Sequence, residues 1–287
     1  MSGADAEKQL DWDGRTRSYL VHLPPDYRPG TPLPLVLALH GGGGNANGNV
    51  RQTGFNAEAD RSGFIVVHPD GTGERRPLLN ALGRGHIHTW NAGSCCGYAV
   101  RENVDDVGFL RALLAQLQRD YSIDPKRIYA SGLSNGGMMS YRLACELGES
   151  IAAIGVVSGA QTVYDARPTA PVSVIHIHGS ADQNVTLAGG IGAKALDRTP
   201  KPPVQEALDF WVRHNGCGAA QITREGPVTR TLYGGGRDGT EVDYYLIEGG
   251  GHSWPGGERM LSILDEPSTA LDASALIWKF FAAHPKP

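Results

Sequence analysis

Hydrophobic residues in this chain fall into short runs with few polar interruptions. Each run is rich in Val, Ile, Leu and Ala, and most of them end in Gly, His or Pro. Runs without alternating polar positions are typical of strands that helices cover on both faces. We therefore predict strands of a mostly parallel sheet at residues 33–40, 63–69, 126–132, 151–159, 172–179 and 242–250.

Helical patterns separate these strands. Residues 104–121 carry apolar side chains three or four positions apart, which gives one apolar face. Asp105 and Asp106 suit the positive N-terminal end of that helix. Two more helices are predicted at 204–217 and 272–284.

The alternation of strands and helices predicts a doubly wound α/β sheet. Residues 13–27 are expected to add antiparallel edge strands, and no linker divides the chain, so residues 1–287 are expected to form one catalytic domain. Two long irregular stretches, 71–103 and 180–203, each follow a predicted strand. Both should lie at the carboxyl edge of the sheet, where open α/β folds bind ligands.

Composition narrows the range of partners. Of 287 residues, 40% are hydrophobic and 20% charged, with a net charge of −4. This balance argues against nucleic acid as the main partner, because phosphate binding needs concentrated Lys and Arg. No apolar stretch approaches the ~20 residues of a membrane-spanning helix, so no membrane partner is expected. The composition leaves the oligomeric state open.

The four cysteines give information on the redox state of the compartment in which the protein works. Cys95 and Cys96 are adjacent, and Cys145 and Cys217 lie far from them, which is not the spacing of a zinc site. Buried free thiols are one interpretation, and we favour one or two disulfides, whose pairing stays open. Disulfides indicate an oxidising compartment. Residues 1–12 carry no signal-peptide core, so we expect either a secreted or periplasmic protein whose signal is absent from this chain, or a cytoplasmic one.

A serine between two glycines follows the run at 126–132. Ser134 stands between Gly132 and Gly136, and a helical pattern begins directly afterwards. Strand, tight turn and helix are the context of a nucleophile elbow, in which glycines let strand and helix backbones approach closely. Ser134 is therefore the candidate nucleophile.

A serine nucleophile needs a base and an acid, which in α/β-hydrolases follow it in the order acid, then His. Asp182 follows the strand at 172–179, and His252 follows the strand at 242–250. We predict that His252 is the general base and that Asp182 fixes its tautomer. The competing acids lie in loops away from strand ends: Asp165, Asp197, Asp238 and Asp265.

An oxyanion hole is predicted after the strand at 33–40. Four glycines follow His40, and their N–H groups can approach a ligand closely. We expect Gly42 to donate one N–H, with Gly43 as the alternative, and Asn135 to donate the other. The Lys of a phosphate-binding Walker loop is missing. His40 is expected to support this loop.

Histidine pairs and tryptophans are the remaining candidates. His176-x-His178 lies on a strand and His86-x-His88 in a loop, but no carboxylate cluster accompanies either pair, so structural roles are favoured over metal binding. We therefore expect no metal and no organic cofactor. Trp90 and Trp254 flank the predicted site and could stack on an aromatic acid or a sugar, although packing of the loops is the alternative.

Longer motifs carry a resemblance to a known family. They are "DGRTRSYLVHLPPDY", "LHGGGGNA", "TWNAGSCCGYA", "NVDDVGFLRALL", "YSIDPKRIYASGLSNGGMMSYRLACE", "HIHGSADQNV" and "GGGHSWPGG". Nearly the whole chain resembles the polyhydroxybutyrate-depolymerase-like esterases of the α/β-hydrolase fold, which include feruloyl and acetylxylan esterases. The resemblance implies that Ser134, Asp182 and His252 are the triad and that no cofactor is needed. Depolymerases proper often carry His-Gly-Cys where this chain has His40-Gly41-Gly42, which favours a soluble ester over a polymer.

We therefore expect a serine carboxylic ester hydrolase that works through an acyl-enzyme. The favoured substrate is a feruloyl or acetyl ester, either small or linked to plant polysaccharide. A depolymerase of polyhydroxyalkanoate oligomers or other aliphatic polyesters is the alternative, and a peptidase is disfavoured because no gating domain is present. From another class, a non-catalytic carbohydrate-binding protein with a relic site remains an alternative.

Overall fold

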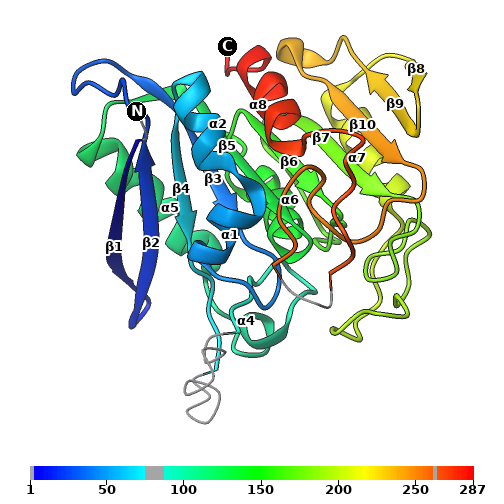
Figure 1. The fold of residues 1–287 in the computed structure, drawn as a ribbon, viewed down its shortest axis with the longest axis horizontal. Helices are drawn as coiled ribbons and strands as arrows, with labels where there is room; N and C mark the ends of the chain where they lie inside the picture. The colour runs from blue at the N-terminus through cyan, green and yellow to red at the C-terminus, as the bar shows by residue number, and fades with distance from the viewer. Residues whose placement is uncertain (1–2, 75–86, 261–263) are drawn as a thin grey trace.

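The computed structural model describes residues 3–74, 87–260 and 264–287. Their strands form one sheet in the order β1-β2-β4-β3-β5-β6-β7-β10-β9-β8 (Figure 1). The inner strands from β4 to β10 run parallel to one another. They are β4 (Ile65–Pro69), β3 (Leu33–Leu39), β5 (Ile123–Leu133), β6 (Ala153–Val157), β7 (Ser173–Gly179) and β10 (Val242–Ile247).

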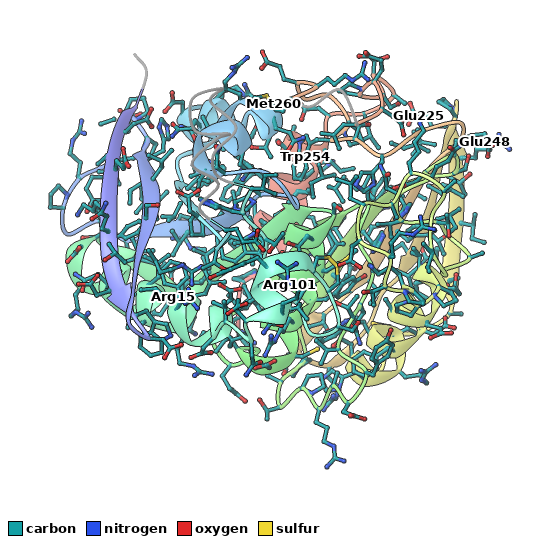
Figure 2. The ribbon with its side chains drawn as sticks, turned by 90° about the horizontal axis from the view of Figure 1, so that it is seen from below. Arg15, Arg101, Glu225, Glu248, Trp254 and Met260 are labelled. Carbon is teal, nitrogen blue, oxygen red and sulfur yellow. A yellow bond between two sulfur atoms is a disulfide. The ribbon has the colours of Figure 1, made fainter. Side chains whose placement is uncertain are left out.

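Antiparallel strands extend this sheet on both sides. A hairpin of β1 (Ala4–Trp12) and β2 (Arg15–Leu23) pairs with β4. On the other side, β9 (Val228–Tyr233) pairs with β10, and β8 (Ala220–Glu225) pairs with β9. Figure 2 shows Glu225 and Glu248 at the rim of the molecule on this side.

Helices cover both faces of the inner strands because successive side chains of each strand point to opposite faces. On β3, Leu35, Leu37 and Leu39 pack with one set of helices, whereas Val36 and Ala38 pack with the other. The first set is α5 (Asp106–Asp120), α6 (Asn135–Glu146) and α7 (Val204–Asn215). The second is α1 (Ala46–Thr53), α2 (Phe55–Ser62) and α8 (Ala273–Ala283). The short elements α4 (Gly97–Arg101) and η1 (Arg237–Gly239) lie outside these layers.

The sequence predicted the inner strands and the helices at 104–121, 204–217 and 272–284, all of which are present. It did not predict β8, β9, α1 or α2. The N-terminal edge strands are also longer than expected, because β1 begins at Ala4 rather than after residue 12.

The strand order changes direction beside β3. From β3 the chain passes to β4 on one side and then to β5 on the other. The loops that leave the carboxyl ends of β3 and β5 therefore diverge, and a crevice opens where they separate, which is the usual ligand site of open α/β sheets. Ser134 and the glycines after His40 lie at this point.

Candidate active site

Ser134 lies on a tight turn between β5 and α6. Its backbone has φ 54° and ψ −118°, a conformation that side chains rarely adopt, and its N–H donates to the Val157 carbonyl at 2.8 Å. A Cβ on Gly132 would lie 2.6 Å from the Leu39 carbonyl oxygen, and a Cβ on Gly136 would lie 2.6 Å from the His40 carbonyl oxygen. The turn therefore requires glycine on both sides of the serine, as the sequence predicted.

Asp182 and His252 meet at the carboxyl ends of neighbouring strands. The Asp182 Oδ2 atom accepts a hydrogen bond from His252 Nδ1 at 2.7 Å, and both side chains are buried. Because Nδ1 carries the proton in this bond, the neutral ring has its lone pair on Nε2. That is the tautomer of a general base.

The Asp182 carboxylate is held by its own turn. Its Oδ1 atom accepts from the backbone N–H groups of Asn184 at 2.8 Å and Val185 at 2.9 Å. Its Oδ2 atom also lies 3.4 Å from His178 Nε2. Burial by itself raises the pKa of Asp182, but hydrogen bonds from His178 and His252 outweigh it and leave that pKa below its ordinary value. Asp182 is therefore ionised at neutral pH.

The competing carboxylates do not meet the His252 ring. Asp265 comes nearest, but its Oδ2 atom accepts from the backbone N–H of His252 at 2.8 Å and its Oδ1 atom pairs with Lys194. Asp197 accepts from the Thr199 N–H and Lys201, while Asp165 and Asp238 are exposed. Asp265 therefore orients the backbone of the histidine loop, and Asp182 orients its ring.

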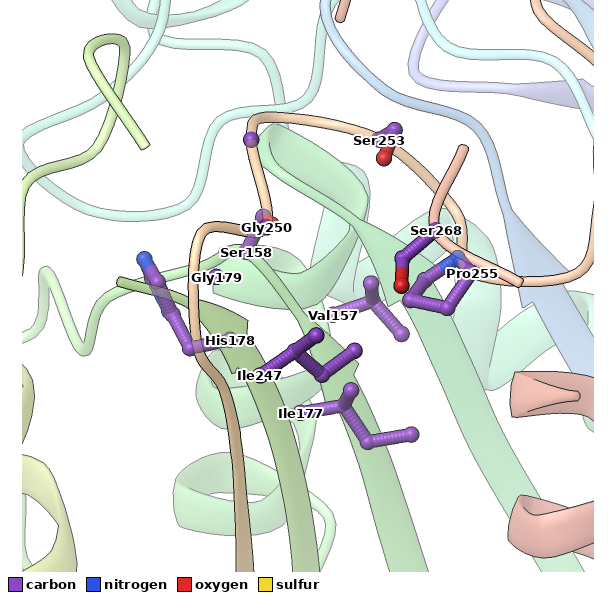
Figure 3. Close-up of a pocket in the computed structure, with 11 residues that line it drawn as sticks. Val157, Ser158, Ile177, His178, Gly179, Ile247, Gly250, Ser253, Pro255 and Ser268 are labelled. Carbon is purple, nitrogen blue, oxygen red and sulfur yellow. The ribbon is translucent and has the colours of Figure 1, made fainter. Parts of the chain in front are cut away.

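Ser134 lies close to the histidine loop. Val157, whose carbonyl accepts from the Ser134 N–H, lines a small cavity together with Gly251 and Ser253, the neighbours of His252 (Figure 3). Ser134 is half-buried. Among the described residues its hydroxyl makes no hydrogen bond, to His252 Nε2 or to any other group, so the structure joins Asp182 to His252 but does not join His252 to Ser134.

Gly42 and Asn135, the expected oxyanion-hole donors, are neighbours in the structure. Within the described residues, neither the Gly42 N–H nor the Asn135 N–H donates a hydrogen bond. A Cβ on Gly42 would lie 3.7 Å from the Asn135 Cβ, so the two residues are neighbours. Gly43 is excluded as a donor because its N–H donates to the His88 carbonyl at 2.8 Å.

Trp90 and Trp254 do not present their rings to a ligand. They are 0% and 1% exposed, and each indole N–H is used inside the protein, by the His40 carbonyl and by Ser274 respectively. Figure 2 shows Trp254 beside α8. The expectation that these rings stack on substrate is therefore wrong for this structure, and both side chains pack the loops instead.

The backbone of Trp90 has a second role that the sequence did not reveal. Its N–H donates to Asn135 Oδ1 at 2.7 Å, and its carbonyl accepts from Asn135 Nδ2 at 3.0 Å. The same carbonyl accepts from the Cys96 N–H at 3.0 Å. The Trp90 segment of the 71–103 stretch is thus fastened to the residue that follows Ser134.

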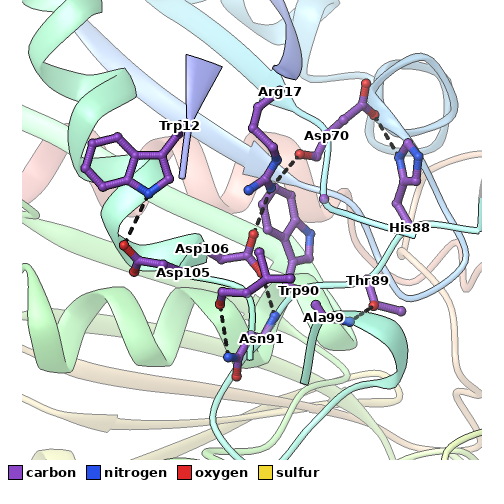
Figure 4. A network of polar contacts seen from close by, with 12 residues as sticks. Trp12, Arg17, Asp70, His88, Thr89, Trp90, Asn91, Ala99, Asp105 and Asp106 are labelled. Carbon is purple, nitrogen blue, oxygen red and sulfur yellow. Dashed lines mark hydrogen bonds and ion pairs between the residues drawn. The ribbon is translucent and has the colours of Figure 1, made fainter. Parts of the chain in front are cut away.

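A buried ion pair fixes this loop from the other side (Figure 4). Arg17 on β2 donates to Asp106 at 2.8 Å, and Asp106 accepts from the Asn91 N–H at 2.8 Å. The two charged side chains are 3% and 0% exposed. Removing either partner would leave an uncompensated buried charge, so the pair specifies where the loop lies.

His40 supports the oxyanion loop, as expected. Its Nδ1–H donates to the Gly41 carbonyl at 2.8 Å, and its Nε2 accepts from the Gly71 N–H at 2.9 Å. Burial lowers the pKa of His40 to about 4, so the ring is neutral. It lies near Asp70 and His88, close enough for the three to share an ion, but both His40 nitrogens are already engaged. His86, considered with His88 above, lies outside the described residues.

The cysteines include one disulfide, between the neighbouring residues Cys95 and Cys96. Cys145 is free and buried, and Cys217 is free and partly buried. Asp197 lies close enough to the Cys95–Cys96 pair to share an ion, but the two sulfurs are bonded to each other. Among the described residues, no helix has both the length and the apolar character to cross a bilayer.

Comparison with known proteins identifies related chains. The sequence model of the family described as "Esterase PHB depolymerase" matches residues 17–217. Feruloyl esterase C of Emericella nidulans is 30% identical over 247 residues, which cover 79% of this chain and 78% of the relative. Feruloyl esterase D of Neurospora crassa is 27% identical over 245 residues, covering 84% and 75%.

Solved structures agree on the fold. An acetyl xylan esterase from Aspergillus awamori superimposes with a TM-score of 0.62 at 15% identity, covering 86% of this chain and 94% of that one. The mostly parallel sheet with helices on both faces is the α/β-hydrolase fold that the sequence predicted.

Proposed function

The chain belongs to the esterase PHB depolymerase family and is a carboxylic ester hydrolase, and from that premise we propose that Ser134 is its nucleophile, His252 its general base and Asp182 the acid that orients the base. One observation carries the proposal. The Asp182–His252 hydrogen bond of 2.7 Å uses Nδ1 and so leaves Nε2 to accept a serine proton, and Ser134 stands on a glycine-flanked turn whose N–H binds Val157, which lines a cavity with the neighbours of His252.

The reaction follows from these positions. The Ser134 hydroxyl attacks the ester carbonyl carbon while His252 Nε2 takes its proton. The proton then passes to the alcohol as the ester bond breaks, and an acyl-serine remains. A water molecule, deprotonated by the same nitrogen, hydrolyses the acyl-serine and restores the hydroxyl. Asp182, ionised and buried, stabilises the imidazolium that forms in both halves of the reaction.

The N–H groups of Gly42 and Asn135 are proposed to stabilise the oxyanion. Each tetrahedral intermediate carries negative charge on the former carbonyl oxygen. Fixed N–H groups with no other partner stabilise that charge without having to reorganise. Loss of one such donor costs roughly 10²–10³ in rate in other enzymes.

For the substrate, we propose a feruloyl or acetyl ester, either small or linked to plant polysaccharide. The similarity to relatives named feruloyl esterase supports this class, as does Gly42 in the oxyanion loop, where depolymerases proper often have cysteine. The family description favours a second candidate, an oligomer of hydroxybutyrate.

The central experiment is Ser134→Ala. We expect hydrolysis of p-nitrophenyl acetate and butyrate to fall to background while the far-ultraviolet circular dichroism spectrum stays unchanged. A fluorophosphonate probe should label the wild type and not this variant. Retained turnover in the variant would refute the assignment of Ser134, and an unlabelled, inactive wild type would favour a binding protein with a relic site.

A second assay separates the substrate candidates. Methyl ferulate, acetylated xylan and hydroxybutyrate oligomers are compared at equal enzyme concentration by their kcat/KM values. We expect one of the first two to be preferred. Preference for the oligomers would move the substrate to the polyester class without altering the roles of Ser134 and His252.

We also propose that the protein works in an oxidising compartment, either outside the cell or in the periplasm. The Cys95–Cys96 disulfide supports this location, because cytosolic thiols are kept reduced. Titration of free thiols in denaturant should detect only Cys145 and Cys217. Detection of all four thiols in freshly isolated protein would contradict the proposal.

A further inference from the structure

Three buried polar side chains, Tyr141, His176 and His178, are hydrogen-bonded in series and end beside Asp182. The Tyr141 hydroxyl lies 2.8 Å from His176 Nδ1, and His176 Nε2 lies 3.0 Å from His178 Nδ1. His178 Nε2 lies 2.8 Å from the Val185 carbonyl oxygen and 3.4 Å from Asp182 Oδ2. Tyr141 and His176 are 0% exposed and His178 is 1% exposed, so water cannot supply alternative partners.

Secondary structure aligns the members of this chain. His176 and His178 are two residues apart on β7, so they share the face that packs against α6, which contributes Tyr141. The planes of the two imidazole rings are inclined by only 15° with centroids 5.3 Å apart, as expected of rings joined edge to edge by the Nε2–Nδ1 bond. Figure 3 shows His178 at the end of its strand, on the opposite side from Ile177.

The Val185 carbonyl fixes the direction of the bond at one end of the chain, and with one proton on each ring the other bonds follow. The Val185 carbonyl can only accept, so His178 Nε2 carries a proton, and when the ring carries that proton alone its Nδ1 accepts. His176 Nε2 must then donate to that Nδ1, and the Tyr141 hydroxyl must donate to His176 Nδ1. Burial and the neighbouring His178 keep the pKa of His176 well below its ordinary value, which supports a neutral ring. All the donor protons in the chain therefore point toward Asp182.

The chain acts on the carboxylate by two routes. His178 Nε2, whose hydrogen bond runs to the Val185 carbonyl, also lies 3.4 Å from the Oδ2 atom that His252 contacts. It also binds the carbonyl of Val185, whose N–H donates to Asp182 Oδ1 at 2.9 Å. Both contacts favour the ionised carboxylate and resist its rotation away from His252.

We propose that Tyr141, His176 and His178 are positioning residues of the esterase, which hold Asp182 in the orientation that His252 requires. The inference rests on the proposed triad and extends it to three residues that do not touch substrate. Hydrogen-bond donors behind a catalytic group set its geometry, and a misplacement of about 1 Å can cost ~10²-fold in rate.

Two variants of His178 test this role. In His178→Gln the side-chain amide can still donate to Val185 and Asp182, whereas His178→Leu removes the donor at similar size. We expect His178→Leu to lower kcat by roughly 10–100-fold with KM within about twofold of wild type, and His178→Gln to recover most of that loss. Equal kcat values for the two variants would overturn the proposal.

His68 offers a matched control. It is 0% exposed on β4 and hydrogen-bonded at both nitrogens, to Asn49 and Asn56, away from Asp182. His68→Leu should lower the melting temperature as His178→Leu does and leave kcat close to wild type. If both Leu variants lower kcat alike, the effect of His178 is general destabilisation and the positioning role is wrong.

Two further measurements keep the test decisive if His178→Leu does not fold. Tyr141→Phe removes only one hydroxyl and should lower kcat by about twofold to fivefold with KM unchanged, whereas wild-type kcat would remove Tyr141 from the chain. In wild-type protein labelled with ¹⁵N-histidine, His176 and His178 should both be neutral and protonated on Nε2 at pH 7. A proton on Nδ1 of either ring would overturn the proposal, and this result does not depend on the outcome for Ser134→Ala.

Discussion

Different interactions determine the shape of the two sides of the candidate active site. The nucleophile side comprises Ser134 and the oxyanion loop, and close packing of backbone against backbone determines its shape. There, carbonyls of Leu39 and His40 lie where a side chain on Gly136 would be. The acid–base side comprises Asp182 and His252, and side-chain hydrogen bonds determine its shape. The first side should fail through steric overlap, and the second through lost polar contacts.

This difference predicts different sensitivities. Backbone packing tolerates no added atom, because neither neighbour can move without shifting a strand of the central sheet. Side-chain hydrogen bonds tolerate a change of size but not a change of donor or acceptor. Substitution of the tightly packed glycines on the nucleophile side should therefore change folding, whereas substitutions on the acid–base side should change turnover.

The largest effect is expected for Gly136→Ala. The new Cβ would overlap the carbonyl oxygens of Leu39 and His40, and relief requires movement of β3 away from α6. We expect a loss of more than about 3 kcal/mol in the free energy of unfolding, measured by urea denaturation, or no folded protein at all. Gly42→Ala is the matched control, since its Cβ would meet only the Asn135 Cβ at 3.7 Å. Equal stability of the two variants would remove the steric half of the comparison.

The next effect is expected for Asp182→Asn. The amide can keep the acceptor that serves Asn184 and Val185, but it presents N–H groups to His252 Nδ1 and so favours the wrong tautomer. We expect kcat to fall by about 10⁴ while the melting temperature changes by a few degrees only. A collapse of the fold, or a kcat near wild type, would contradict the view that this side acts through proton positions.

The smallest expected effect is on the pH dependence of the free energy of unfolding. Titratable groups on the two sides lose their contributions to stability in different pH ranges. Burial lowers the pKa of His40 to about 4, so the unfolded chain binds its proton near pH 6.5 and the folded chain does not. The stability that His40 contributes is complete above pH 6.5 and is lost as pH falls toward 4, with a slope of at most about 1.4 kcal/mol per pH unit. His68 and His176, whose pKa values are also lowered, add to this slope.

Variants on the two sides should therefore alter different parts of the stability curve. His40→Gln should reduce the slope between pH 6.5 and 4, measured by urea denaturation at each pH. The pKa of Asp182 is lowered from 3.8, so its contribution is present above pH 3.8 and is lost only at lower pH. An unchanged slope in His40→Gln would show that this ring gains its proton without unfolding.

Much of the nucleophile side could be predicted from the sequence, because the spacing of glycines shows where two backbone segments must pack closely against each other. The turn at Ser134 and the loop after His40 follow from glycines at strand ends. The inner strands were predictable for a related reason, since burial on both faces leaves near-continuous apolar runs. What the sequence left open on this side was the choice between Gly42 and Gly43, which depends on the bond from Gly43 to His88.

The missed features lack such local signals. Strand β8 is exposed throughout, with Ile222 68% exposed, so it has no alternation of apolar and polar positions to reveal it. The burial of Trp90 and Trp254 depends on which distant segments cover them, and an indole is equally suited to a core or a binding surface. The Tyr141–His176–His178 chain joins α6 to β7, and spacing within either element does not indicate that contact.

The short turn around Asp182 has a consequence for protein engineering. The carboxylate is secured by Asn184 and Val185, its near neighbours in the chain, so the rest of the irregular stretch up to residue 203 does not hold the acid in place. That segment can be varied while Asp182 keeps its place, provided that Lys194, which pairs with Asp265 of the histidine loop, is retained. Exchanging it between homologous enzymes, as a cassette, is therefore a rational route to new acyl selectivity.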